Sequence, residues 1–414
     1  MKAAAAGLVL SAFAAATAEA QPAHLESAGA ARRPLQQTIR FDDIAPKGMV
    51  LQQCWNATGI DDQERVYIGF TGRRADGRED FAVFRYDPAT GSRRLLGSFL
   101  ETSQSAGNLH PGEEIPKGHT RLVALGGRIY MGSQGFHDFK RGLAALPRHR
   151  GSHLYAYDTA ADVLEDLSRS LPGGVVTRHT GIIALTAMPG RNLLAGLEHP
   201  SSNIVLFDTV ANRVQTVLRG IPWQEGNPLS REIVATRQGR IYTYRGTEEP
   251  RHRGRRHAIW MHDLATGENR PTTHTATGGF WNGQSGTRDG EAIFLSTVNG
   301  ELYRLATSSG EFTHLGHFLP KAEVDAGERI GQLYGITLSA DETTIYAVPR
   351  RSRSKESNLY AYDIATGTVT LAGRLEPALY AGSHVRDSRG NLYLGRFGSD
   401  KASEGQAGLA ILTP

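Results

Sequence analysis

Seven copies of one short apolar pattern recur along the 414 residues, and this repeat constrains the fold more than any other feature. Each copy follows a turn and is followed by a second strand-like run that usually ends on aspartate. Blocks of four short strands spaced about 40–50 residues apart are typical of β-propellers. The sequence therefore predicts an all-β fold, a seven-bladed β-propeller of four-stranded antiparallel blades. The copies are Val66-Tyr67-Ile68, Ile129-Tyr130-Met131, Leu193-Leu194-Ala195, Ile241-Tyr242-Thr243, Ile293-Phe294-Leu295, Ile345-Tyr346-Ala347 and Leu392-Tyr393-Leu394.

The start of the chain differs in composition from the repeats. Lys2 precedes a small-apolar stretch over residues 3–16, and Ala18-Glu19-Ala20 forms an A-x-A cleavage pattern. These features predict a signal peptide over residues 1–20, cleaved after Ala20, and a secreted or periplasmic protein. We expect a flexible leader over residues 21–38 and a single propeller domain over residues 39–414. No later apolar run is long enough to insert into a membrane, and a closed propeller leaves no sheet edge that demands a partner, so a monomer is expected.

Charge and cysteine content narrow the function classes. Cys54 is the only cysteine, so we expect a buried structural thiol rather than a disulfide or a nucleophile. The chain has neither a CxxC pair nor an HExxH helix, so the strong metal-binding motifs are absent and any metal site is unknown. The formal charge is only +4, yet residues 251–257 and 350–355 are compact basic clusters. Such clusters are either solvated loop surface or part of a site for anions.

Strand alternation places the candidate functional residues on one face of the propeller. His119 and His179 begin the innermost strands of blades two and three, and His137 and His199 follow the second strands of the same blades. Arg231 begins the innermost strand of blade four. Loops at the end of a rigid scaffold commonly carry function, so we expect the four histidines to be catalytic. Substrate-binding positions predicted near the same mouth are Arg231, Trp281, Asn282, Tyr334 and His384.

A cationic mouth in a secreted protein favours an anionic polysaccharide or oligosaccharide as the ligand. Nucleic acid is not expected, because the mouth lacks aromatics interleaved for base stacking. Uronate glycans can be cleaved by β-elimination, which requires a cation for the carboxylate, a base for the C5 proton and an acid for the departing O4. Histidine can serve as base or acid, and the planar Arg231 guanidinium suits a carboxylate. Glycoside hydrolysis usually needs two facing carboxylates, and no obvious pair exists among Asp138, Glu198, Glu232, Glu248 and Glu249.

The segment Glu114-Ile115-Pro116-Lys117-Gly118-His119-Thr120, followed by His137, resembles the first histidine pair of propeller-fold polysaccharide lyases. That family includes the ulvan lyases and the rhamnose–glucuronate lyases. The resemblance implies lyase activity, with catalytic roles for His119 and His137. The family places a tyrosine and an arginine on the next blade, whereas this chain has His179 and His199 there. Some members of the family hold a structural calcium in the central channel, so the resemblance also implies calcium as a possible cofactor.

Two other functions remain open at this stage. One is a glycoside hydrolase or lactonase on the same scaffold, which would require a water activated by a metal or a base. The other is a non-catalytic carbohydrate-binding propeller whose histidines are structural. Fold alone cannot choose between them, because propellers support many functions.

Overall fold

The computed structural model describes residues 35–134, 150–218, 230–244, 257–276, 281–354, 356–398 and 406–414. The chain divides into two compact units, residues 1–31 and residues 32–414, and all described residues belong to the second unit. The signal peptide expected over residues 1–20 therefore lies outside the described residues. Within the described ranges, no helix is long and apolar enough to cross a membrane.

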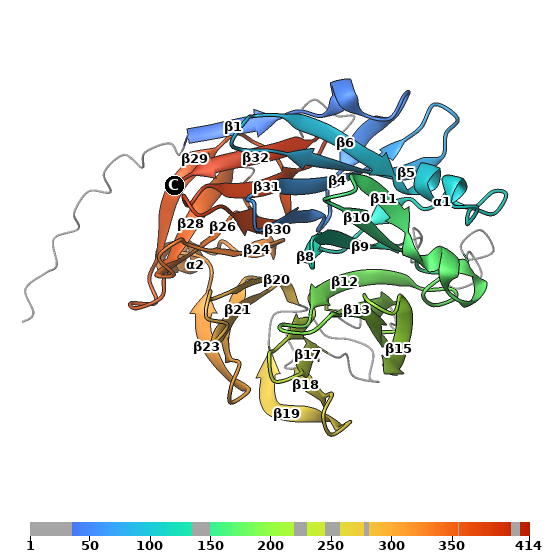
Figure 1. Cartoon of the computed structure of the whole chain (residues 1–414). Coiled ribbons are helices and arrows are strands. Elements are labelled where there is room, and N and C mark those ends of the chain that lie inside the picture. The colour runs from blue at the N-terminus through green and yellow to red at the C-terminus, as the bar shows by residue number, and fades with distance from the viewer. Residues whose placement is uncertain are drawn as a thin grey trace, which may run out of the picture. The chain divides into compact units, whose positions relative to one another are not determined.

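Seven antiparallel sheets surround one axis, which confirms the predicted all-β, seven-bladed propeller (Figure 1). Each apolar triplet lies in the second strand of its blade, as expected. Blade one contains β2 (Val50–Gln53), β3 (Thr58–Ile60), β4 (Val66–Arg73), β5 (Glu79–Tyr86) and β6 (Arg93–Ser98). Blade two contains β7 (Lys117–Gly118), β8 (Val123–Leu125), β9 (Arg128–Gln134), β10 (Leu154–Asp158) and β11 (Val163–Asp166). Blade three contains β12 (Gly181–Ala187), β13 (Leu193–His199), β14 (Ile204–Asp208) and β15 (Arg213–Leu218).

The remaining blades follow the same order from the axis outward, and short elements decorate the connections. Blade four contains β16 (Val234–Ala235), β17 (Arg240–Tyr244), β18 (His257–Asp263) and β19 (Asn269–Ala276). Blade five contains β20 (Trp281–Gly286), β21 (Ala292–Thr297), β22 (Glu301–Ala306) and β23 (Glu311–His317). Blade six contains β25 (Thr337–Leu338), β26 (Thr344–Ala347), β28 (Ser357–Asp363) and β29 (Val369–Leu375). Blade seven contains β30 (Tyr380–Arg386), β31 (Leu392–Arg396), β32 (Gly408–Thr413) and β1 (Leu35–Ile39). The additional elements are α1 (Phe99–Ser105), α2 (Lys321–Asp325), a ribbon of β24 (Ile330–Gln332) with β27 (Arg350–Arg351), and 3-10 turns at Asp42–Ile44, Leu167–Ser170 and Pro172–Gly174.

The ring closes through the first strand of the chain. β1 pairs with β32 from Leu35 opposite Thr413 to Ile39 opposite Leu409, so both ends of the propeller share blade seven. The Gln36 side chain also donates to the Tyr380 hydroxyl at 2.6 Å. The propeller thus begins at Leu35 rather than at the expected residue 39, because the end of the expected leader supplies the outer partner of the last strand.

Removing this closing strand should destabilise the propeller. A chain shortened to begin at Arg40 leaves the outer edge of β32 unpaired and removes the Gln36 donor of the Tyr380 hydroxyl, which keeps its bond to the Glu376 carbonyl. We expect the free energy of unfolding to fall by at least about 2 kcal/mol, because several ladder hydrogen bonds worth roughly 0.5–1.5 kcal/mol each are lost. Urea unfolding of the shortened and full chains measures this difference, and equal midpoints would contradict the closure.

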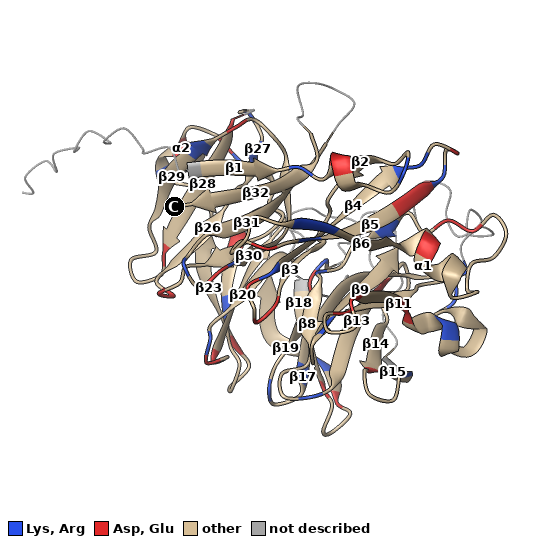
Figure 2. Cartoon of the chain, turned by 45° about the horizontal axis from the view of Figure 1, so that its top comes forward, with Lys and Arg blue, Asp and Glu red and all other residues tan. Residues whose placement is uncertain are grey.

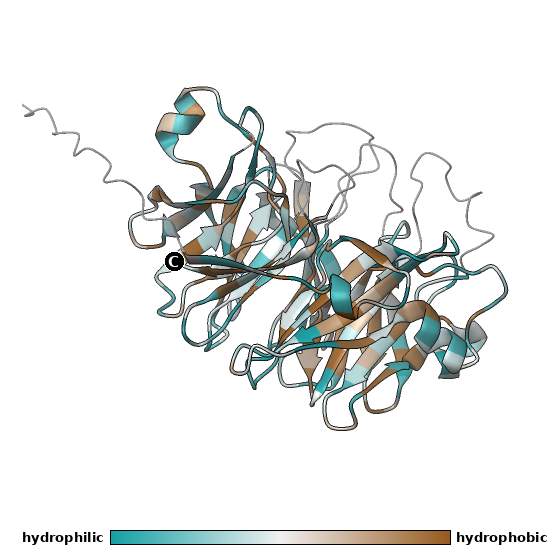
Figure 3. Cartoon of the chain, turned by 90° about the horizontal axis from the view of Figure 1, so that it is seen from above, coloured by the Kyte–Doolittle hydropathy of each residue, from teal (hydrophilic) through white to brown (hydrophobic). Residues whose placement is uncertain are grey.

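Apolar side chains on the strands pack the blades against one another, and hydrophobic segments lie along the strands in Figure 3. The triplet tyrosines belong to this core: Tyr67, Tyr242 and Tyr393 are at most 2 % exposed. Charged residues lie mainly in loops and at strand ends (Figure 2). Cys54 is fully buried, and burial raises the pKa of its thiol to about 12, as expected for a structural cysteine.

The innermost strands are irregular where they approach the axis. The inner strand of blade two is interrupted between β7 and β8, and that of blade one between β2 and β3. The register of β20 shifts between Trp281 and Gly283, and that of β30 shifts between Ala381 and Val385. Bulges and breaks redirect side chains that a regular strand would point elsewhere. His119, Trp55, Asn282 and His384 lie at these irregular positions.

Candidate functional site

Five polar residues from four blades form one group, which we call the axial cluster: Lys117, His119, His199, Arg231 and Tyr334. The charge of Arg231 acts on the pKa of each of the other four. The Lys117 ammonium also lowers the pKa of both histidines. These five residues come from blades two, three, four and six. Side chains of four different blades can influence one another's charge in this way only near the axis of the propeller. The structure therefore brings together four of the residues predicted from sequence.

An aromatic group borders the axial cluster. The Trp55 ring stacks on the His119 imidazole with centroids 5.7 Å apart and planes at 18°. The Lys117 ammonium lies 4.8 Å from the centre of the Trp55 ring, which is within the range of a cation–π contact. Phe397 meets Trp55 edge-on at 5.2 Å and Tyr334 at 6.0 Å. These contacts fix the orientations of Lys117 and His119.

Both histidines of the cluster are neutral at pH 7. Burial, followed by the charges of Arg231 and Lys117, holds the pKa of His119 well below its ordinary value. The same causes lower the pKa of His199 to about 4. An imidazole with such a pKa is a weak base. At pH 7 it is not in the protonated, cationic form that could give up a proton as an acid. The expectation that these histidines serve as acids is therefore not supported by their environment.

Hydrogen-bond partners assign the tautomers of the two imidazoles. His119 Nδ1 lies 3.4 Å from the Ile183 carbonyl oxygen, so Nδ1 carries the proton and the Nε2 lone pair is the acceptor. His199 Nδ1 lies 3.5 Å from the Gln134 amide nitrogen, so Nδ1 accepts and Nε2 carries the proton. The cluster thus contains one imidazole with a basic Nε2 and one with a donor Nε2.

Two cations give the cluster its charge. Burial and the neighbouring Arg231 lower the pKa of Lys117 to about 8, so most of the ammonium is still protonated at pH 7. Arg231 is partly exposed and remains charged although burial lowers its pKa. Its backbone N–H donates to the Trp281 carbonyl at 2.8 Å, which ties blade four to blade five. Burial raises the pKa of Tyr334, so this hydroxyl stays protonated and can donate a hydrogen bond.

A second polar group, made of Arg121, Glu232, Gln284 and His384, lies along the inner strands. Arg121 donates to Glu232 at 3.4 Å and to the Gln284 carbonyl at 2.6 Å, and Gln284 donates to Glu232 at 2.7 Å. Burial and the charge of Arg121 lower the pKa of His384 to about 3. His384 was expected at the mouth with Tyr334, but its charged neighbour is Arg121 rather than Arg231.

Three further predicted residues have other roles. Trp281 is fully buried and stacks on Phe312 at 5.7 Å in the core between blades four and five, so it is a packing residue. Asn282 donates to the Leu333 carbonyl at 2.5 Å and links blades five and six. His179 is exposed, has a positive φ of 59°, and lines a pocket that none of the cluster residues lines. Its backbone N–H donates to the Arg150 carbonyl, which holds it at that pocket.

Several predictions fall on residues outside the described ranges. These residues are His137, Asp138, Glu248 and Glu249. The basic cluster at residues 251–257 also lies outside the described residues, except for the backbone of residue 257. The second basic cluster is partly neutralised, because Arg351 forms ion pairs with Glu323 and Glu356 at 3.1 and 3.2 Å. Ion pairing of this kind is typical of a structured loop surface.

The part of the chain that the structure describes contains neither the side-chain group for metal-assisted hydrolysis nor the carboxylate pair for glycoside hydrolysis. No group of three or more His, Cys, Asp and Glu side chains could hold a metal ion there, so the described residues offer no such side-chain site for calcium. Glu198 accepts from Thr180, Ser201 and Asn203, at 3.0–3.3 Å. Glu232 is occupied by Arg121 and Gln284. Neither carboxylate faces a second one as a glycosidase pair would.

Sequence reasoning missed Lys117, Trp55 and Phe397. A signal for Lys117 was present, because it lies two residues before His119 in Lys117-Gly118-His119 and strand side chains recur on one face with a period of two. Trp55 and Phe397 lie far apart in sequence, in blades one and seven. Only the closure of the ring places them together.

Comparisons with known proteins agree with the fold and go no further. No family model matches the chain, and no curated protein matches it. A chain of a crystal structure of the mitotic checkpoint complex aligns with 98 % of this chain and 99 % of its own, with a TM-score of 0.56 and 12 % identity. The RRP9 WD40 repeats align with 92 % of this chain and 99 % of their own (TM-score 0.55, 10 % identity). The structure of U3-55K covers 92 % of this chain and 98 % of its own (TM-score 0.53, 9 % identity). These similarities show a propeller fold; none of the three is a polysaccharide lyase, so they do not support the resemblance to that family.

Proposed function

We propose that this protein is a secreted polysaccharide lyase that cleaves a uronate-containing glycan by β-elimination at the axial cluster. The observation that carries the proposal is the meeting of two cations, Lys117 and Arg231, with a neutral imidazole whose Nε2 is an acceptor, that of His119. A carboxylate placed on the cations would lie beside a base, which is the arrangement that elimination requires. The aromatic face of Trp55 supplies an apolar surface next to these groups.

Each side chain then has one role in the elimination. Arg231 and protonated Lys117 neutralise the uronate carboxylate and acidify the C5 proton. His119 Nε2 takes that proton, the C5–H electron pair forms the C4–C5 double bond, and the C4–O4 bond breaks. The Tyr334 hydroxyl gives its proton to the departing O4, and His199 Nε2–H orients the substrate by donating a hydrogen bond. His119 and Tyr334 exchange protons with solvent before the next turnover.

A non-catalytic function remains the second candidate, and the low pKa values of the histidines favour it. A weakly basic imidazole is a poor acceptor for a carbon-bound proton. The same cations together with Trp55 would hold an anionic glycan without cleaving it. The two functions share the ligand class and differ in whether a product forms.

A substrate screen tests the proposal. Purified protein is mixed with ulvan, a rhamnose–glucuronate glycan, pectic oligomers and glycosaminoglycans, and unsaturated uronate is followed by its ultraviolet absorbance. A rising signal with at least one uronate glycan is the expected result. Binding of such a glycan without any rise, by folded protein, would contradict the lyase and support the non-catalytic alternative.

The pH profile should depend on Lys117. Because its pKa is about 8, the ammonium loses its charge above that pH, and kcat/KM should fall as pH rises through about 8. Lys117→Arg keeps the charge and should move this alkaline limb above about pH 10, because arginine stays protonated there. If kcat/KM of the Lys117→Arg variant still falls as pH rises through about 8, a group other than Lys117 causes the fall.

A further inference from the structure

A pocket of about 610 Å³ lies outside the axial cluster, between the loops that precede blades two and three. Its volume suits a small organic molecule rather than a bare ion. Its charged and titratable lining residues are Arg150, Arg169, Arg178, His110 and His179, and no carboxylate of the described residues lines it. Its other lining residues are Asn108, Leu171, Gly173, Gly174 and Val175.

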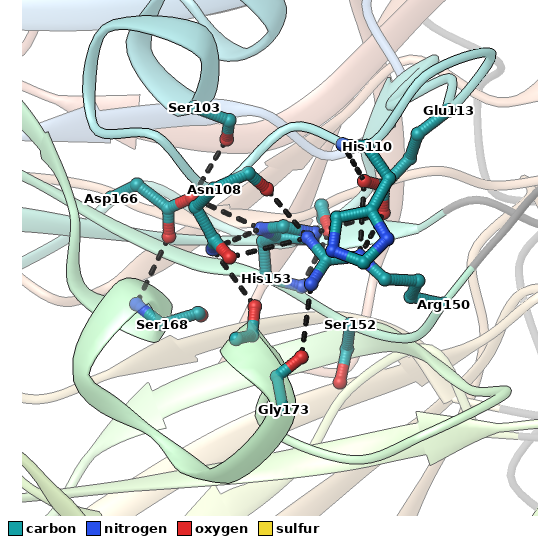
Figure 4. A network of polar contacts seen from close by, with 12 residues as sticks. Ser103, Asn108, His110, Glu113, Arg150, Ser152, His153, Asp166, Ser168 and Gly173 are labelled. Atoms are coloured by element: carbon teal, nitrogen blue, oxygen red, sulfur yellow. Dashed lines mark hydrogen bonds and ion pairs between the residues drawn. The ribbon is translucent and has the colours of Figure 1, made fainter.

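A buried, charge-balanced network supports the pocket (Figure 4). His153 is fully buried between Asp166, 3.1 Å from Nδ1, and Glu113, 3.4 Å from Nε2. Hydrogen bonds to these carboxylates outweigh the effect of burial and raise the pKa of His153. Arg150 pairs with Glu113 at 3.1 Å. When His153 is protonated, two cations balance two carboxylates, and the network then adds no net charge to the pocket.

The wall of the pocket is held by the same network. Arg150 donates to the Gly173 carbonyl at 2.9 Å, and Asn108 donates to the Gly174 carbonyl at 2.8 Å. Gly174 has a φ of 69°, and a Cβ there would lie 2.1 Å from the Asn108 side-chain oxygen. The turn therefore requires glycine at this position, and it seats the loop directly against the network.

The charge that remains is positive and exposed. Arg169 and Arg178 are exposed, and neither forms an ion pair within the described residues. The Arg178 backbone is anchored by a β-bridge to Gly151, and its guanidinium lies near Gly173. Two guanidinium groups that pair with no described carboxylate lie at this one pocket, and they match two negative charges, because arginine binds phosphate and carboxylate oxygens through paired N–H donors.

We propose that this side pocket binds a small organic dianion, with Arg169 and Arg178 as its charge partners. A sugar phosphate and a short oligosaccharide with two uronate carboxylates share this chemistry. The site is separate from the axial cluster and does not depend on the proposed lyase activity.

Calorimetry with the full chain tests the proposal, using glucose 6-phosphate, digalacturonate, inorganic phosphate and glucose. We expect at least one organic dianion to bind more tightly than inorganic phosphate, and glucose not to bind. Binding of glucose 6-phosphate would identify the ligand as a sugar phosphate, and binding of digalacturonate would identify it as a uronate oligosaccharide. The double variant Arg169→Gln with Arg178→Gln should weaken binding by about 10- to 100-fold, since a charge-assisted contact is lost at each position.

Arg374→Gln, at an exposed arginine of β29, is the matched control and should bind as the wild type does. Thermal unfolding of all variants should be unchanged, and so should glycan cleavage at the axial cluster. The proposal is overturned if neither organic dianion binds, if inorganic phosphate binds equally well, or if the double variant and Arg374→Gln behave alike.

Discussion

Replacing His153 with alanine should lower the free energy of unfolding by about 3–5 kcal/mol, because removing one partner of a buried ionic network leaves uncompensated charges. Asp166 and Glu113 are at most 3 % exposed and would lose the imidazolium that lies between them. Among the described residues Arg150 forms an ion pair with Glu113 alone, so Asp166 would keep hydrogen bonds from Ser103 and Asn108 but would have no cation from this part of the chain. Urea unfolding at pH 6 measures the difference.

The stability of the wild type should also depend on pH through this network. The pKa of His153 is raised, so its contribution is complete below about pH 6.5 and is lost as pH rises through the folded-state value. The pKa of Glu113 is lowered to about 2 and that of Asp166 is lowered as well, so their contribution is complete above about pH 4.5 and is lost as pH falls toward 2. We expect maximal stability between about pH 4.5 and 6.5 from these groups.

His314→Ala is the matched control for this prediction. His314 is half exposed on β23 and pairs with Glu301 at 2.6 Å, so its loss should cost no more than about 1 kcal/mol. A His153→Ala variant as stable as His314→Ala would contradict the charged network. A His153→Ala variant whose free energy of unfolding varies with pH as that of the wild type does would also contradict it.

Replacing His119 with asparagine should lower the rate of glycan elimination by about 10²–10⁴-fold, which is the usual contribution of a positioned base. The asparagine amide can still donate to the Ile183 carbonyl, as Nδ1 does, but it has no basic nitrogen in place of Nε2. The stacking on Trp55 is the contact that changes most. Initial rates from the ultraviolet absorbance of the product measure this effect.

The affinity of the His119→Asn variant for the glycan shows whether the substitution removes only the base or also disrupts the binding site. With Arg231 and Lys117 intact, His119→Asn should bind the glycan within a few-fold of the wild type, and His314→Ala should retain full activity. Loss of binding together with rate would assign His119 a structural role. A variant as fast as the wild type would show that His119 is not the base.

The blade architecture could be predicted from sequence because each blade repeats the same local pattern. The triplets, such as the fully buried Val66-Tyr67-Ile68, are short apolar runs that each follow a turn, and this signal does not depend on distant residues. The closing strand at Leu35–Ile39 carried no comparable signal. Its structure is decided by pairing with β32 at the other end of the chain.

The site could be predicted only in part, because irregular backbone determines where its side chains point. His119 and His199 were found from their positions next to strands, whereas His179 follows the same sequence rule and lines a different pocket. Its positive φ and its hydrogen bond to the Arg150 carbonyl redirect it. The low pKa values of the cluster histidines depend on burial and on the charges of Arg231 and Lys117, and a single sequence gives no pattern from which burial at this position could be predicted.

Cleavage in heavy-oxygen water is the most direct test of elimination at the axial cluster. The wild-type protein is incubated with a uronate glycan that it binds, and the products are weighed by mass spectrometry. The account predicts an unsaturated uronate at one new end. It also predicts that the new reducing end gains heavy oxygen no faster than the reducing end of an uncleaved control oligosaccharide exchanges with the solvent, because elimination adds no water. A saturated uronate at the new end with heavy oxygen gained faster than in that control, or a glycan that remains intact, would contradict it.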